Sequence, residues 1–183
     1  GLSEAEVRPF VAPHEGRVEI GALNSPDSVT LSGDADALVA IERTLHEREV
    51  YCRPLKVSYA FHSHHMDGIR DDLRASLQDV RTRDSGIRVY AAVTGRPAAS
   101  GDFGSDYWWG NVREPVRFGD AVLGLVNDGF DLFLEVGPHP VLSGAELGDD
   151  AGGQSVLPHL VGVGMARPAE GHRGRLAGRP GEV

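Results

Sequence analysis

Residues 17–49, RVEIGALNSPDSVTLSGDADALVAIERTLHERE, carry the pattern that decides the fold class. RVEIGAL (17–23) and SVTLSG (28–33) alternate apolar and polar residues, which predicts two strands. NSPDS (24–28), which joins them, consists of residues that favour turns. DADALVAIERTLHERE (34–49) then places apolar side chains three and four positions apart, with aspartates at its start that can cap a helix. The stretch therefore predicts a hairpin followed by a helix.

The flanking segments extend this unit in both directions. LSEAEVRPFV (2–11) is expected to be a helix, because its serine and the glutamate three positions later have the spacing of a capping box. VYCRPLKV (50–57) has the composition of a strand, and its proline places it at a sheet edge. The order helix–strand–strand–helix–strand is that of a βαββαβ, ferredoxin-like unit without its first strand. We expect residues 1–57 to form this small subdomain.

The second half of the chain continues the alternation of helices and strands. Apolar residues at steps of three and four predict helices over 66–80 and 119–129. GIRVYAAV (86–93) reads as a strand, and a further helix is expected over PVLSGAEL (140–147). DLFLEV (131–136) is nearly continuous apolar sequence, as in parallel strands that are buried on both faces. The chain as a whole is therefore predicted to be an α/β protein.

Residues 151–183 have a different character. They contain eight glycines, three prolines, four arginines and no aromatic residue. Such a composition buries too little apolar surface to offset the entropy of the chain. Two interpretations stay open: the segment is a linker, or it is the translation of a shifted reading frame. We expect disorder after about Leu160.

The composition excludes several kinds of partner. The formal net charge is −9, with 27 acidic and 18 basic residues and no basic stripe that would attract nucleic acid. No apolar run approaches the roughly 20 residues that cross a membrane, and no basic-then-apolar leader begins the sequence. The single cysteine, Cys52, excludes an internal disulfide and fits a reducing cytoplasm. Because the sequence begins with Gly1 and not with methionine, we expect a fragment of a longer protein.

VSYAFHSHHMDGI (57–69) places three histidines within four positions, between a strand-like segment and a helical one. No metal site is expected, because structural zinc needs four ligands and the lone cysteine has no neighbouring one. Two interpretations stay open: a polar loop with one buried imidazole, and a general base at the end of a strand, where α/β folds build active sites. Ser63 is a poor nucleophile for that base, because neighbouring strand residues point apart and no GxSxG elbow occurs in the chain.

Five stretches together resemble the malonyl-type acyltransferase domains of type I polyketide synthases. YAFHSHHMDGI is similar to the histidine motif of that family. The other four, in the order of the family, are GLSEAEV (1–7), ALNSPDSVTLSGD (22–34), YWWGNVREPVRF (107–118) and FLEVGPHPVL (133–142). The resemblance covers roughly residues 1–160. It implies a partial α/β-hydrolase-like large subdomain over residues 58–150, into which the ferredoxin-like small subdomain is inserted.

The resemblance also implies an activity, that of an acyltransferase within a multifunctional synthase of antibiotic biosynthesis. Such domains hold no bound cofactor. They transfer malonyl or methylmalonyl from coenzyme A, through a serine ester, to the phosphopantetheine of an acyl carrier protein. His62 matches the general base that activates the serine. Asn111 matches the residue whose backbone carbonyl orients this imidazole, and a turn cap is an equally open role for it. The implied partners are malonyl-CoA, the carrier protein and neighbouring synthase domains, with no nucleic acid and no membrane.

Tyr59 and Phe61 match the positions that accompany substrate choice. In the family, HAFH accompanies malonyl and YASH accompanies methylmalonyl, whereas this chain has YAFH. The ring of Phe61 would crowd an α-methyl branch, so malonyl is the expected substrate. A single methyl group is worth only about 1–3 kcal/mol in such a pocket.

Four other residues in the matching stretches are expected to be structural. Glu135 and His139 match a motif that shapes the loop beside the site. Trp108 and Trp109 are expected to pack in the core or at the subdomain interface.

The family's serine, its oxyanion-hole glutamine and its carboxylate-binding arginine match no residue here, and we expect all three upstream of Gly1. The chain alone is therefore expected to be inactive. A non-catalytic interaction module that keeps the ferredoxin-like insert, and a different serine hydrolase built on the same half-fold, are the alternatives. The polyketide product and the iterative or modular nature of the parent are not encoded in this stretch.

Overall fold

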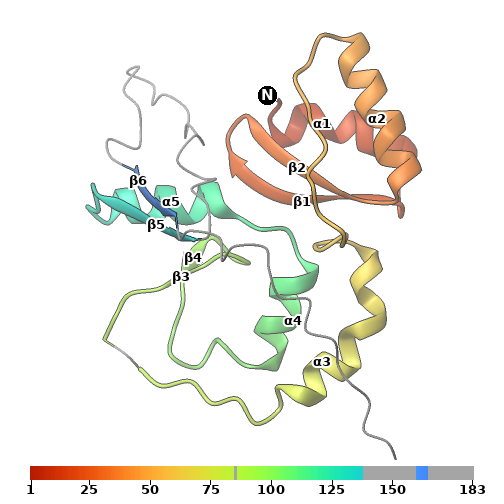
Figure 1. Cartoon of the computed structure of the whole chain (residues 1–183). Coiled ribbons are helices and arrows are strands. Elements are labelled where there is room, and N and C mark those ends of the chain that lie inside the picture. Colours follow the sequence, from red (N-terminus) through yellow and green to blue (C-terminus); the bar gives the residue numbers. More distant parts are fainter. Residues whose placement is uncertain (85, 138–159, 165–183) are drawn as a thin grey trace, which may run out of the picture.

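The computed structural model describes residues 1–84, 86–137 and 160–164, and these form an α/β arrangement (Figure 1). The helices are α1 (Glu4–Val11), η1 (Ala12–His14), α2 (Ala35–Glu47), η2 (His64–Ile69), α3 (Arg70–Ser76), α4 (Ser105–Arg113) and α5 (Phe118–Asn127), of which η1 and η2 are 3-10 helices. The strands are β1 (Val18–Ser25), β2 (Ser28–Gly33), β3 (Tyr90–Ala91), β4 (Arg96–Pro97), β5 (Phe133–Gly137) and β6 (Leu160–Gly164).

The N-terminal part is the predicted hairpin, β1 antiparallel to β2, packed against α1 and α2 (Figure 1). α1 begins with the predicted capping box: the Ser3 hydroxyl oxygen accepts from the Glu6 N–H, and Glu6 accepts from the Ser3 N–H at 2.8 Å. The core consists of Val18, Ala37, Ile41 and Leu45, all buried. The helical spacing of Leu38, Ile41 and Leu45 predicted this face: Ile41 and Leu45 are in the core, and Leu38 packs against it partly buried, beside the unpredicted Ala37.

The strand expected over residues 50–57 is wrong. The structure assigns no strand there, and Tyr51, Leu55 and Val57 are exposed. A strand forms only where a neighbour accepts its hydrogen bonds, and in the described part of the chain β1 and β2 pair only with each other as strands. Pro54 also removes one donor. The ferredoxin-like description of residues 1–57 therefore stays a prediction that rests on α1, β1, β2 and α2 alone.

The second half contains shorter elements than the sequence pattern predicts. The helix expected over 66–80 consists of η2 and α3 and ends at Ser76. The strand expected over 86–93 is reduced to β3, which pairs with β4. α5 agrees with the predicted helix, and Gly129 follows it with a φ of 91°, a left-handed value that favours glycine.

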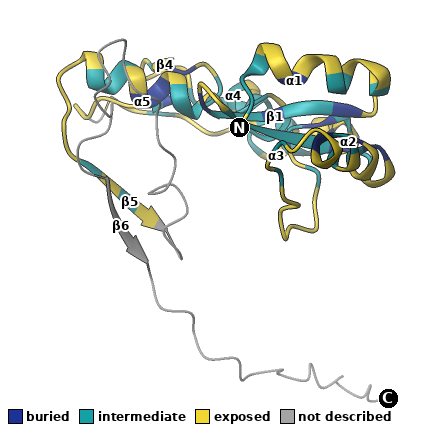
Figure 2. Ribbon diagram, turned by 90° about the horizontal axis from the view of Figure 1, so that it is seen from above, coloured by how far each residue is buried: buried dark blue, intermediate teal, exposed yellow. Residues whose placement is uncertain are grey.

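β5 is parallel to β6, as the apolar composition of DLFLEV predicts, but it is not buried. Leu134 and Val136 are 61% and 73% exposed, so the prediction of burial on both faces is wrong (Figure 2). β6 also contradicts the disorder expected from Leu160 for the five residues that it contains. The helix expected over 140–147 and the rest of the tail lie outside the described residues.

A short parallel contact joins the two halves of the chain. Val116, just after α4, donates its N–H to the Gly21 carbonyl at 2.9 Å and accepts from the Leu23 N–H at 2.7 Å. The segment after α4 is thereby fixed to β1. Among the described residues, no helix is long and apolar enough to span a bilayer.

Candidate active site

His62 is held by its own backbone in an unusual conformation. Its φ is 61°, a left-handed value that is uncommon for a residue other than glycine. Its N–H donates to the carbonyl of Val112, in the last turn of α4, at 2.9 Å. Strained backbone of this kind occurs often at functional sites, where the surrounding structure fixes it. Here the end of α4 supplies that constraint.

The imidazole of His62 is oriented by a second contact with the same segment. Nδ1 lies 2.8 Å from the backbone carbonyl oxygen of Glu114. A carbonyl oxygen only accepts hydrogen bonds, so Nδ1 must carry the proton in this contact. In the neutral ring, Nε2 then has the free lone pair that a general base needs.

Asn111 is not the residue that orients this ring, and the prediction is corrected here. Asn111 lies inside α4, whereas Glu114 follows the helix with an extended backbone, φ −85° and ψ 158°. This change of direction brings the Glu114 carbonyl to His62. The sequence contained a signal for it, because Glu114 precedes Pro115, and residues before proline favour extended conformations.

Glu19 and Arg113 connect residues 62–69, the histidine segment, to the hairpin, and the sequence analysis missed both. Arg113 donates to the two Glu19 oxygens at 2.6 and 3.0 Å and, through Nε, to Asp67 at 2.7 Å. Glu19 also accepts from the backbone N–H of His64 at 2.9 Å. Partial burial lowers the pKa of Arg113, but the hydrogen bonds that it donates to Glu19 and Asp67 raise it above its usual value overall. β1, η2 and α4 thus meet at one partly buried ion pair beside His62.

Ser63 has a structural role in the described site. Its side chain is fully buried, and its hydroxyl donates to the Ala60 carbonyl at 2.6 Å. The same oxygen accepts from the N–H of His65 at 3.4 Å, at the start of η2. This agrees with the expectation that Ser63 is not a nucleophile.

Phe61 and Tyr59 lie near the His62 ring. The ring centroid of Phe61 is 6.4 Å from that of His62 and 5.9 Å from that of Tyr59. Both rings are exposed, Phe61 by 48% and Tyr59 by 68%. The carbonyl of Phe61 accepts from the Ser32 hydroxyl at 2.6 Å, which ties this segment to β2. Aromatic surface is therefore available beside the imidazole.

The two tryptophans that are expected to be structural make other contacts. Trp108 is 39% exposed and packs edge-on against Tyr107, with ring centroids 5.2 Å apart. Trp109 lies against the Arg70 guanidinium, 5.9 Å from the ring centroid, and so connects α4 with α3. Glu135 is in β5, and His139 lies outside the described residues.

Comparison with known proteins decides the family. The sequence model of the family described as "Acyl transferase domain" matches residues 1–160. The chain belongs to the acyl transferase domain family. Polyketide synthase GfsB of Streptomyces halstedii is 40% identical over 172 residues, which are 93% of this chain and 3% of that protein. Erythronolide synthase EryA3 of Saccharopolyspora erythraea is 38% identical over 146 residues, 79% of this chain and 4% of that protein.

Solved acyl transferase domains share the fold. The acyltransferase domain from module 8 of the salinomycin polyketide synthase superimposes with a TM-score of 0.81 at 29% identity, over 88% of this chain and 38% of that one. The domain from the second module of the same synthase gives a TM-score of 0.76 at 33% identity, over 87% and 37%. This acyl transferase chain therefore spans less than half the length of the solved domains and a few per cent of the curated synthases.

Proposed function

We propose that this chain supplies the general base of a polyketide synthase acyltransferase domain, and that His62 is this base. The observation that carries the proposal is the contact between His62 Nδ1 and the Glu114 carbonyl, which leaves Nε2 free to accept a proton. Serine and cysteine acyl transfer uses an imidazole in this tautomer, oriented by a third group. In this site the third group is a backbone carbonyl.

The proposed reaction has two similar halves. Nε2 takes the proton of a serine hydroxyl while the serine oxygen attacks the thioester carbonyl of an acyl-CoA. The carbon–sulfur bond breaks, the imidazolium returns the proton to the departing CoA thiolate, and an acyl-serine ester remains. The thiol of a carrier-protein phosphopantetheine then gives its proton to Nε2 and attacks the ester carbonyl. The bond between this carbonyl and the serine oxygen breaks, the imidazolium returns the proton to the serine oxygen, and the acyl group remains on the thiol.

The serine of this scheme is proposed to come from residues of the domain outside this chain. No Gly-x-Ser-x-Gly sequence occurs in the 183 residues, and the Ser63 hydroxyl is buried and hydrogen bonded. The solved acyltransferase domains are more than twice as long as the stretch that this chain matches. We expect that the chain alone gains no mass when it is incubated with malonyl-CoA.

Malonyl is the proposed acyl group, because Phe61 lies beside the His62 ring. In a complete domain that contains these residues, Phe61→Ser is expected to raise the kcat/KM for methylmalonyl-CoA relative to malonyl-CoA. A methyl group in a pocket is worth about 10- to 200-fold. An unchanged ratio would show that Phe61 does not set the choice.

The base is tested in the same complete domain by substitution of His62. His62→Gln is expected to lower the rate of acyl-serine formation by about 10²–10⁴-fold, because general base catalysis contributes this much. His46→Gln, at the end of α2, is the matched control and is expected to react at the wild-type rate. If His62→Gln forms the acyl-enzyme as fast as the control, His62 is not the base.

A further inference from the structure

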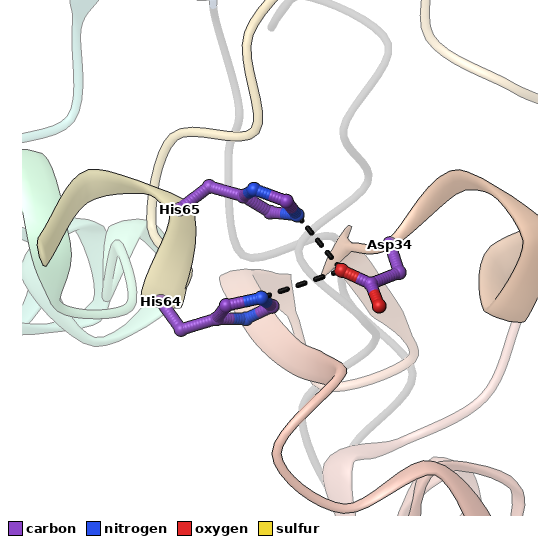
Figure 3. Close-up of side chains that lie close together, drawn as sticks. All are labelled: Asp34, His64 and His65. Atoms are coloured by element: carbon purple, nitrogen blue, oxygen red, sulfur yellow. Dashed lines mark hydrogen bonds and ion pairs between the residues drawn. The ribbon is translucent and has the colours of Figure 1, made fainter. Parts of the chain in front are cut away.

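The two histidines that follow the proposed base point at one carboxylate. His64 and His65, at the start of η2, place Nε2 atoms 3.3 and 2.9 Å from Oδ1 of Asp34, the residue between β2 and α2 (Figure 3). Their rings are tilted by 33° relative to each other, with centroids 4.3 Å apart. All three ligand atoms lie within 4.8 Å of one another. Residues thirty positions apart thus converge on a single point.

The surroundings of His64 favour positive charge on the ring or beside it. Its Nδ1 is buried without a hydrogen-bond partner and lies 3.8 Å from Oε1 of Glu19, while its Nε2 faces Asp34. A neutral imidazole has one donor and one acceptor, so it can donate to only one of two carboxylates. If Nδ1–H faces Glu19, the lone pair of Nε2 faces the Asp34 oxygen. A second proton on the ring removes this repulsion, and so does a cation bound between Nε2 and the Asp34 oxygen.

The charge of Asp34 is available for such a cation. Its other oxygen, Oδ2, accepts from Arg17 Nε at 2.8 Å, so Oδ1 remains for the histidines. The hydrogen bond from Arg17 favours the ionised carboxylate, which is the form that binds a metal ion.

We propose that Asp34, His64 and His65 form a binding site for a divalent transition metal ion of the zinc class. Zinc bonds to histidine nitrogen and carboxylate oxygen are about 2.0–2.1 Å long and tetrahedral, so two ligand atoms lie about 3.3 Å apart. The separations of 2.9 and 3.3 Å in this cluster already approach that spacing. The Glu19 carboxylate, 3.8 Å from the other ring nitrogen of His64, is on the side where the outer hydrogen-bond partner of a metal-bound histidine lies.

The site leaves a coordination position open and links two parts of the chain. His65 is 45% exposed, so water can complete the tetrahedron. Asp34 belongs to the hairpin unit, and the histidines lie within three residues of His62. A bound ion would therefore fix the segment of the proposed base to the small subdomain. The sequence analysis expected no metal site, because it weighed the histidines against the lone cysteine and nothing in the sequence brings Asp34 to them.

A second cluster in the described residues, Glu42, His46 and Cys52, provides an internal control. Burial, followed by the charge of Glu42, raises the pKa of the Cys52 thiol. Metals bind the thiolate, so this cluster is the poorer site at neutral pH. His46→Gln removes its imidazole and leaves the proposed site intact.

The test titrates the full chain with Zn²⁺ by calorimetry and with Co²⁺ by visible absorption. Wild type and His46→Gln are expected to bind one equivalent of Zn²⁺ with the same affinity, and to show the absorption of tetrahedral Co²⁺. His65→Gln and Asp34→Asn are each expected to weaken binding at least tenfold. Zn²⁺ should raise the Tm of wild type and of His46→Gln but not that of His65→Gln.

Three results would overturn the proposal: no binding of Zn²⁺ by wild type at micromolar concentration, equal affinity in wild type and His65→Gln, or loss of binding in His46→Gln. His65→Gln is the deciding variant, because the half-exposed ring can be replaced without a cavity, whereas Asp34→Asn also weakens the Arg17 contact. Circular dichroism of each variant without metal confirms that it is folded. None of these readouts depends on acyl transfer, so the outcome is independent of the proposed function.

Discussion

Substitution of Arg113 by methionine tests whether the Glu19–Arg113 ion pair fixes the histidine segment. The pair is partly buried, with side chains 19% and 29% exposed, and Arg113 makes three hydrogen bonds to Glu19 and Asp67. Exposed pairs contribute about 0–1 kcal/mol, and breaking a fully buried one costs about 3–5 kcal/mol. For this intermediate burial we expect Arg113→Met to lower the free energy of unfolding by about 2 kcal/mol. In a chain of this length that corresponds to a Tm lower by about 4–8 °C.

Thermal unfolding followed by circular dichroism measures this change, and Arg43→Met is the matched control. Arg43 pairs with Glu47 on the surface of α2 at 3.0 Å and is 82% exposed, so its loss should cost less than about 0.5 kcal/mol. Amide exchange of His62 provides a local readout, because its N–H is bonded to the Val112 carbonyl. This amide should exchange faster in Arg113→Met and unchanged in Arg43→Met. Equal Tm values for the two variants, with the wild-type exchange rate at His62, would refute the role given to the pair.

Two further predictions concern the scaffold. Ile41→Ala, in the core of the hairpin unit, should lower the free energy of unfolding, measured by chemical denaturation, by about 2–5 kcal/mol. Val39→Ala, at a position 62% exposed on the same helix, should change it by less than about 0.5 kcal/mol. Equal losses in the two variants would show that the core lies elsewhere. The Tyr90 hydroxyl donates to Asp128 at 2.7 Å and holds the pKa of that carboxyl below its ordinary 3.8. Ionised Asp128 therefore stabilises the fold at neutral pH, and the stability difference between wild type and Asp128→Asn should shrink as pH falls through this lowered pKa. A difference that grows on acidification would contradict this sign.

Sequence patterns predicted the elements whose formation is local. α1 has its capping box, α2 has apolar residues on one face, and the β1–β2 hairpin is closed by turn residues. Residues 50–57 have the same strand-like composition as β1, yet they form no strand, because strand formation depends on a neighbour that local sequence does not supply. β5 does form a strand, but the burial of its faces likewise depends on neighbouring elements that the local sequence does not reveal.

The candidate site was predictable in its chemistry and not in its contacts. A motif predicted His62 as the base, but the choice between Asn111 and Glu114 as the partner of its ring depends on where α4 ends. The pairing of Glu19 with Arg113 joins positions 94 residues apart, and no periodicity connects them. Opposite charges at such distances in sequence meet only once the segment after α4 is bound to β1.

The tautomer of His62 tests the central claim most directly. Nitrogen-15 NMR of histidine-labelled protein, with the signals assigned from a His62→Gln spectrum, reports which ring nitrogen carries the proton at a pH where the ring is neutral. The predicted result is a protonated Nδ1, hydrogen bonded to the Glu114 carbonyl, and an unprotonated Nε2. A ring with its proton on Nε2 would have no lone pair where the serine proton must go, and it would contradict the assignment of His62 as the base.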